Sequence, residues 1–122
     1  MAKRKSQLAH DELVKHVADF YIKENHPNVK ADIQGYNKPN VIKWRDQNSG
    51  HIPDVTTGNS IIIEVETDDS IDDIHTKDQW RLFSTYAQEH KVKFYIVVPK
   101  GSEQKAKKRN VELELNGEVI GL

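Results

Sequence analysis

Three carboxylates, Asp54, Glu64 and Glu66, lie within a stretch of thirteen residues. A Thr-Gly-Asn turn signal at 57–59 separates two segments with β-strand character, which predicts a β-hairpin. Side chains alternate across a strand, so Glu64 and Glu66 share one face, and a three-residue loop would place Asp54 opposite Ile62 on that face. Like charges this close are costly unless a cation lies between them, and oxygen ligands favour Mg²⁺, Mn²⁺ or Ca²⁺ over Zn²⁺. The pattern therefore predicts a divalent-cation site.

The elements around this hairpin are predicted by the apolar periodicity of the chain. Residues 92–98 carry apolar side chains on both faces, which is typical of a central strand covered on both sides. The unit of strand, helix and strand from Ile61 to Val98 predicts parallel pairing. We expect an α/β fold, a three-layer α/β/α sandwich with a central mixed β-sheet. Helices are expected over 7–25, from Thr76 onward, and over 103–113. The spacing of Thr76 to Gln79 fits a capping box at the start of the second helix. Further strands are expected over 29–34, 41–44, 92–98 and 119–120.

The length of 122 residues predicts one domain spanning 1–122. The chain has no cysteine, which leaves out disulfides and thiolate metal sites and favours a reducing cytoplasm. No apolar run is long enough to cross a bilayer, so no membrane association is expected.

The net charge of −1 is unevenly distributed. Acidic residues gather over 64–78, and basic residues gather at Lys3–Lys5 and near the C-terminus. The C-terminal cluster is a candidate phosphate-contacting surface for DNA and comprises Lys105, Lys107, Lys108 and Arg109. The sequence leaves the oligomeric state open, with a homodimer among the alternatives.

The hairpin motif resembles that of the PD-(D/E)xK nuclease superfamily, which includes many restriction enzymes and Holliday-junction resolvases. The resemblance rests on Pro53-Asp54, nine intervening residues, and Glu64-Val65-Glu66 at the end of an apolar strand, with helices and strands in a compatible order over most of the chain. Glu66 replaces the lysine of the family, as in the minority of members that use E-x-E. The resemblance implies a restriction-endonuclease-like fold and a Mg²⁺-dependent endonuclease, with Mn²⁺ as a substitute.

The resemblance also implies roles for individual residues. Asp54, Glu64 and the carbonyl of Val65 would hold the metal ion, and Glu66 would accept a proton from the attacking water or help to hold a second cation.

Two further candidates lie outside the hairpin. Glu12 matches the acidic residue that many members place on the first helix beside the metal, although a solvated pair of Glu12 with His16 is the simpler interpretation. Gln79 matches half of a Gln-x-x-x-Tyr signature, because Phe83 stands at the position of the tyrosine.

Three functions are compatible with this sequence. The leading one is a metal-dependent nuclease that hydrolyses DNA phosphodiester bonds. The second is a catalytically inactive nuclease-fold module that binds nucleic acid or a protein partner, which the missing lysine and the acidic run favour. The third, carboxylates on a solvated sheet face, ranks last because three acids around an apolar strand call for a cation.

Overall fold

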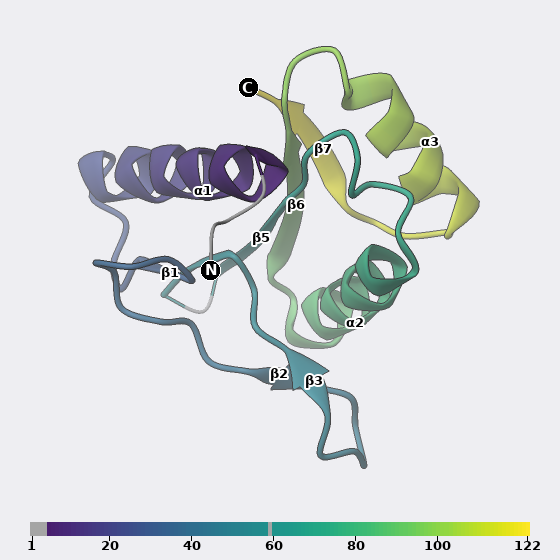
Figure 1. The fold of residues 1–122 in the computed structure, drawn as a ribbon. Helices are drawn as coiled ribbons and strands as arrows, with labels where there is room; N and C mark the ends of the chain where they lie inside the picture. The colour runs from purple at the N-terminus through teal and green to yellow at the C-terminus, as the bar shows by residue number, and fades with distance from the viewer. Residues whose placement is uncertain (1–4, 59) are drawn as a thin grey trace.

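Three helices and a five-stranded mixed sheet make up residues 5–58 and 60–122, the part of the chain that the computed structural model describes (Figure 1). Among these residues, no helix is long and apolar enough to cross a membrane. The helices are α1 (Lys5–Lys23), α2 (Ile74–His90) and α3 (Glu103–Glu112). The strands of the sheet are β1 (Lys30–Ala31), β4 (Val55–Thr57), β5 (Ile61–Val65), β6 (Lys93–Val98) and β7 (Glu118–Gly121).

The strand order of the sheet is β1-β4-β5-β6-β7. Short connections allow antiparallel pairing of β1 with β4 and of β4 with β5, whereas α2 carries the chain across to β6, which runs parallel to β5. The strand β7 extends the sheet in parallel on the other side of β6. The predicted α/β class, the mixed sheet and the parallel unit are confirmed.

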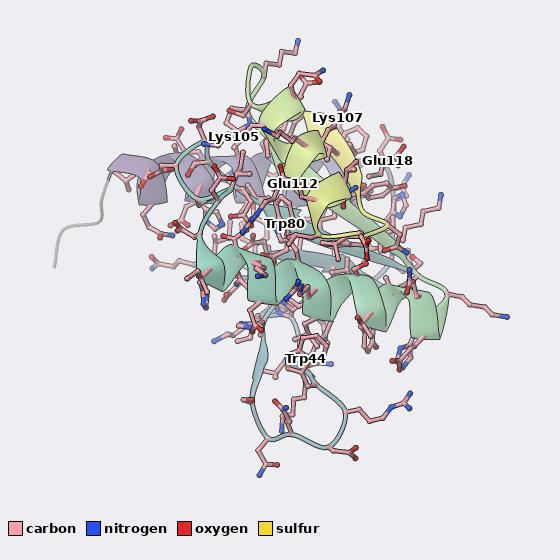
Figure 2. All side chains as sticks on the ribbon, turned by 90° about the vertical axis from the view of Figure 1, so that its right-hand side faces the viewer. Trp44, Trp80, Lys105, Lys107, Glu112 and Glu118 are labelled. Carbon is pink, nitrogen blue, oxygen red and sulfur yellow. The ribbon has the colours of Figure 1, made fainter. Side chains whose placement is uncertain are left out.

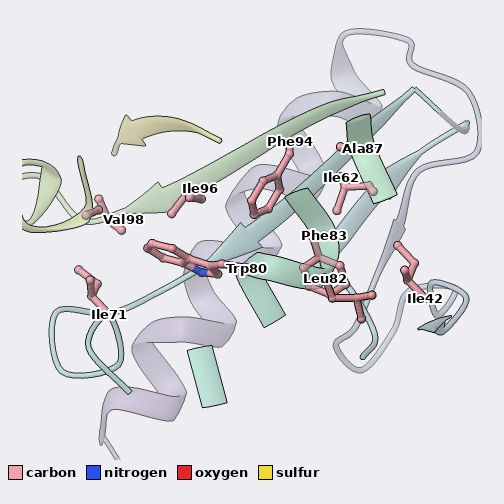
Figure 3. Close-up of a cluster of buried hydrophobic side chains, with 11 residues drawn as sticks. Ile42, Ile62, Ile71, Trp80, Leu82, Phe83, Ala87, Phe94, Ile96 and Val98 are labelled. Atoms are coloured by element: carbon pink, nitrogen blue, oxygen red, sulfur yellow. The ribbon is translucent and has the colours of Figure 1, made fainter. Parts of the chain in front are cut away.

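Both faces of β5 are buried, and each face belongs to a different hydrophobic core. Ile61, Ile63 and Val65 pack with Val14 and Val17 of α1. Ile62 belongs to the other core, with α2, the alternate residues of β6, and Ala106 of α3 (Figure 3). Helices therefore lie on both faces of the sheet, α1 on one and α2 and α3 on the other (Figure 1).

The hairpin register differs from the predicted one. Thr56 pairs with Ile62 and Val55 with Ile63. Asp54, one residue before β4, therefore lies beside Glu64 and not opposite Ile62. The strand β4 continues through Thr57, which leaves residues 58–60 as the connection and moves the pairing by two residues. Because a shift of two preserves the side-chain direction, Asp54 still comes close to Glu64.

Three predicted boundaries are wrong. The first helix spans Lys5–Lys23 instead of 7–25, and Asn25 just beyond it adopts a positive φ of 63°, which no continuing helix allows. The strand expected over 29–34 is reduced to Lys30–Ala31. The capping box at Thr76 is also wrong, because α2 begins at Ile74 with Asp73 as its N-cap, and Thr76 is buried in the first turn.

A second hairpin stands outside the main sheet and consists of β2 (Ile42–Lys43) and β3 (Gly50–His51). The expectation for 41–44 is confirmed, but its partner β3 was not predicted because Gly and His carry no strand signal. His51 joins this hairpin to α2, since its Nε2 lies 2.6 Å from Oδ2 of Asp78. The hairpin projects away from the sheet beside α2 (Figure 1).

Ile71 provides a test of the packing between β5 and α2. It is fully buried in the loop before α2, where it faces Trp80 at one end of the core (Figure 3). We predict that Ile71→Ala lowers the free energy of unfolding by about 2–4 kcal/mol, measured by urea denaturation, because it leaves a cavity. Ile74→Ala is the matched control, since Ile74 is 85% exposed and its replacement should change stability by less than about 0.5 kcal/mol. Equal effects of the two substitutions would contradict this packing.

Candidate functional site

Asp54 stands directly before β4 and connects that strand to the end of β5. Its backbone N–H donates to Oε1 of Glu64 at 3.0 Å, and its Oδ2 accepts from the backbone N–H of Val65 at 2.8 Å. The pairing of β4 with β5 ends at Val55, and these two bonds continue the contact between the two segments beyond it. The carboxylates of Asp54 and Glu64 are therefore held in place by the backbone of each other's strand.

Glu64 is buried inside the protein, with 2% of its surface exposed. Burial, followed by the negative charges of Asp54 and Glu66, raises the pKa of Glu64 well above its ordinary value. The hydrogen bond from Asp54 acts in the opposite direction but is outweighed. A carboxyl group in this position is costly to ionise unless a cation compensates its charge.

His10 of α1 completes the surroundings of Asp54. Its Nε2 lies 3.2 Å from Oδ2 of Asp54, and its Nδ1 lies 3.1 Å from Oδ1 of Asp11. Burial lowers the pKa of His10, but the hydrogen bond and charge of Asp54 outweigh it and raise that pKa to about 9. The sequence analysis missed His10, although its spacing of four and seven residues to the buried Val14 and Val17 places it on the inward face of the helix.

Glu66 is bound by side chains of α2 and of the loop before it. Its Oε2 accepts from Nε1 of the fully buried Trp80 at 3.0 Å, and its Oε1 accepts from Oγ of Ser70 at 2.7 Å. Thr76 adds a longer contact of 3.4 Å to the same oxygen. Burial raises the pKa of Glu66 to about 7, against the lowering effect of these donors. Both carboxyl oxygens are thus engaged by protein donors, which links the end of β5 to α2.

The two candidates outside the hairpin do not contact these carboxylates by any hydrogen bond among the described residues. Glu12 is exposed on α1, two residues from the position where His10 reaches Asp54. Gln79 is half-buried in α2, beside Trp80, whose indole reaches Glu66. His10 contacts Asp54 and Trp80 contacts Glu66 instead.

The capacity of the site for a metal ion follows from the oxygens that remain available. Within the described part of the chain, no three His, Asp or Glu side chains converge as a ready-made metal cage. Oδ1 of Asp54 and Oε2 of Glu64 have no hydrogen bond to other described residues. The N–H and C=O of one residue point the same way in a strand, so the carbonyl of Val65 faces the side of Asp54. Two carboxylate oxygens and a carbonyl suit Mg²⁺, which keeps several waters and takes further ligands from a phosphate.

The basic cluster of α3 divides into two parts. Nζ of Lys105 donates to the backbone oxygen of Asp68 at 2.8 Å and lies 3.6 Å from Oδ2 of Asp72, so this lysine holds the acidic loop. Lys107 and Lys108 are exposed on the same helix, as Figure 2 shows for Lys107, and Nζ of Lys108 lies 4.0 Å from Oε1 of Glu112 at the surface. Arg109 is half-buried, and its Nε has no hydrogen-bond partner in the described structure. The N-terminal basic group at 3–5 lies outside the residues whose side chains are described.

Comparison of the chain with protein-family models, with curated proteins and with solved structures finds no match.

Replacement of Glu64 tests the electrostatic cost of the site. The pKa of Glu64 is raised in the folded state, so this group contributes its full stabilisation of the fold below its ordinary pKa of 4.5. That contribution is lost as the pH rises above 4.5, because the carboxyl group ionises more readily in the unfolded chain. Gln has no such penalty and can still accept from the N–H of Asp54. We predict that Glu64→Gln stabilises the protein in chelator, and that this gain grows from pH 4.5 to pH 8 in urea denaturation.

The control for this experiment is Glu118→Gln, because Glu118 is exposed on β7 (Figure 2). It should leave both stability and its pH dependence nearly unchanged. A pH-independent effect of Glu64→Gln, or a destabilising one at pH 8, would contradict the electrostatic strain.

Proposed function

We propose that this chain is a metal-dependent nuclease that hydrolyses DNA phosphodiester bonds, with the three-layer α/β/α fold of restriction endonucleases. The order of elements supports this proposal, with α1 before the antiparallel strands β1, β4 and β5, and α2 leading to the parallel strand β6. The proposed fold places the metal site at the start of β4 and the end of β5. Asp54 and Glu64 stand at these two positions.

The observation that carries the proposal is the fixed pair of Asp54 and Glu64. The first carboxylate is held by the N–H of Val65 and the second by the N–H of Asp54, and each has one oxygen left without a protein hydrogen bond among the described residues. If these two side chains served structure alone, Asn and Gln in their places would cost less free energy to bury, because Glu64 is almost fully buried. Retention of both charges is explained if a cation binds between them.

The residues have separate roles in this proposal. Asp54, Glu64 and the carbonyl of Val65 hold Mg²⁺, or Mn²⁺ in its place. The bound cation would polarise the scissile phosphate and lower the pKa of the attacking water. His10 keeps Asp54 in position through its hydrogen bond to Oδ2. We assign Glu66 to the support of the site, because Trp80 and Ser70 occupy both of its oxygens.

Cleavage by single variants tests this division of roles. Asp54→Asn should lower the rate of DNA cleavage in Mg²⁺ by roughly 100-fold or more, because it removes one of the two charges that hold the cation. Glu66→Gln should lower the rate by less than about tenfold, since Gln can accept from Trp80 and donate to Ser70. Linear, nicked, single-stranded and branched DNA serve as substrates, with chelator as the blank.

Two outcomes would change the assignment. A loss of roughly 100-fold or more in Glu66→Gln would give Glu66 the role of a proton acceptor. If the wild-type protein cleaves no substrate in Mg²⁺ or Mn²⁺ but binds DNA, the proposal fails and the inactive nucleic-acid-binding module replaces it.

The exposed lysines of α3 are the proposed contacts with DNA phosphates. Replacing Lys107 and Lys108 with Gln should weaken binding uniformly across sequences and lower the slope of log K against log salt by roughly 1 to 2. Lys105→Gln is the matched control on the same helix and should change the slope little, because Asp68 and Asp72 already compensate its charge. Fluorescence anisotropy at several salt concentrations measures both. An unchanged slope in the double variant would remove α3 from the interface.

A further inference from the structure

A hollow of about 440 Å³ opens beside the core that contains Ile62, away from the carboxylates. It lies at the start of β5, where Ile62 precedes Glu64 by two residues on the same side of the strand. Ile42 and Ile62 mark the end of the core that borders it, opposite the end with Ile71 and Val98 (Figure 3). This volume is in the range of pockets that bind small molecules.

The lining of the hollow combines apolar and polar groups in comparable measure. Ile42, Ile62 and Val92 provide the apolar surface, and Tyr86, whose ring stacks on His90, adds an aromatic side chain. An aromatic side chain beside apolar ones suits a planar ring system.

The polar groups of the lining are two amides and a hydroxyl, contributed by Asn28, Asn40 and Thr56. An amide side chain both donates and accepts hydrogen bonds, so it suits the edge of a heterocycle or the hydroxyls of a sugar.

Lys30 sets the charge of the ligand. It is the single charged residue of the lining, and it is half-buried with no ion pair to other described residues. Its pairing with Thr56 on β4 fixes its place at the rim. An ammonium group at the rim of a hollow without a carboxylate partner favours an anionic ligand.

We propose that this hollow binds a nucleoside monophosphate, with the base against Ile62 and Tyr86 and the phosphate on Lys30. A planar heterocycle, sugar hydroxyls and one anionic group match the three kinds of lining in turn. The inference does not depend on metal binding or DNA cleavage, because none of its residues belongs to the carboxylate site.

Binding is measured by NMR with thymidine monophosphate, adenosine monophosphate, the two nucleosides and inorganic phosphate as probes. The monophosphates should bind with Kd at or below about 1 mM and shift the signals of Thr56, Ile62 and Tyr86. Lys30→Gln should weaken the monophosphates about tenfold and leave the nucleosides unchanged, because it removes one charge-assisted hydrogen bond. The matched control is Lys93→Gln, an exposed lysine on β6 outside the lining, which should leave every affinity unchanged.

Three results would overturn this inference. These are the absence of saturation up to about 10 mM monophosphate, equal weakening by Lys30→Gln and Lys93→Gln, and signal shifts confined to the lysines of α3. Titration of the Asp54→Asn variant separates the inference from the proposed nuclease activity. Monophosphate affinity should be unchanged in that variant even where cleavage is lost.

Discussion

The burial of Glu64 next to Asp54 is the constraint on which the site depends. A carboxylate with almost no solvent contact faces a second carboxylate, and a third, Glu66, follows directly after the end of β5. The protein compensates part of this cost with backbone N–H groups and with His10. The remainder is electrostatic strain, and a bound cation would relieve it without any change in the fold.

The arrangement of the elements serves to hold these groups together. The helix α1 contributes His10 from one face of the sheet, and α2 contributes Trp80 from the other. The end of β5 lies between them, because its alternate residues pack into both cores. Glu66 fits this view as a buried anchor, since a lysine at its position would meet the N–H of Trp80 with another donor. The carboxylate of Glu66 is therefore matched by the donors Trp80 and Ser70.

The sequence predicted those features that depend on local periodicity. The apolar alternation of 92–98 and the run at 61–65 identified β6 and β5, and the crossover between them implied parallel pairing. The prediction that Asp54 and Glu64 lie on the same side of the sheet is confirmed in spite of a register error of two residues, because side chains alternate with a period of two along a strand. Predictions failed where tertiary contacts decide the outcome. The partner of Asp54 is His10, which lies 44 residues earlier in the chain, and the donors to Glu66 lie in α2 and its preceding loop.

The basic cluster illustrates the same limit. Clustering in sequence placed Lys105 with Lys107 and Lys108, but helix geometry turns Lys105 toward Asp68 and Asp72. The charges of Asp68 and Asp72 in the acidic run are partly compensated by this lysine. A charge pattern predicts which residues could contact phosphate, whereas the partners within the fold decide which of them remain accessible.

Mn²⁺ binding measured by calorimetry tests whether a cation compensates the charge of Glu64. The account predicts one site with a Kd at or below about 1 mM, loss of that site in Glu64→Gln, and retention in Glu118→Gln. It also predicts that binding releases protons, because the cation displaces the proton that burial favours on Glu64. Equal Mn²⁺ affinity in wild type and Glu64→Gln, or binding without proton release, would contradict it.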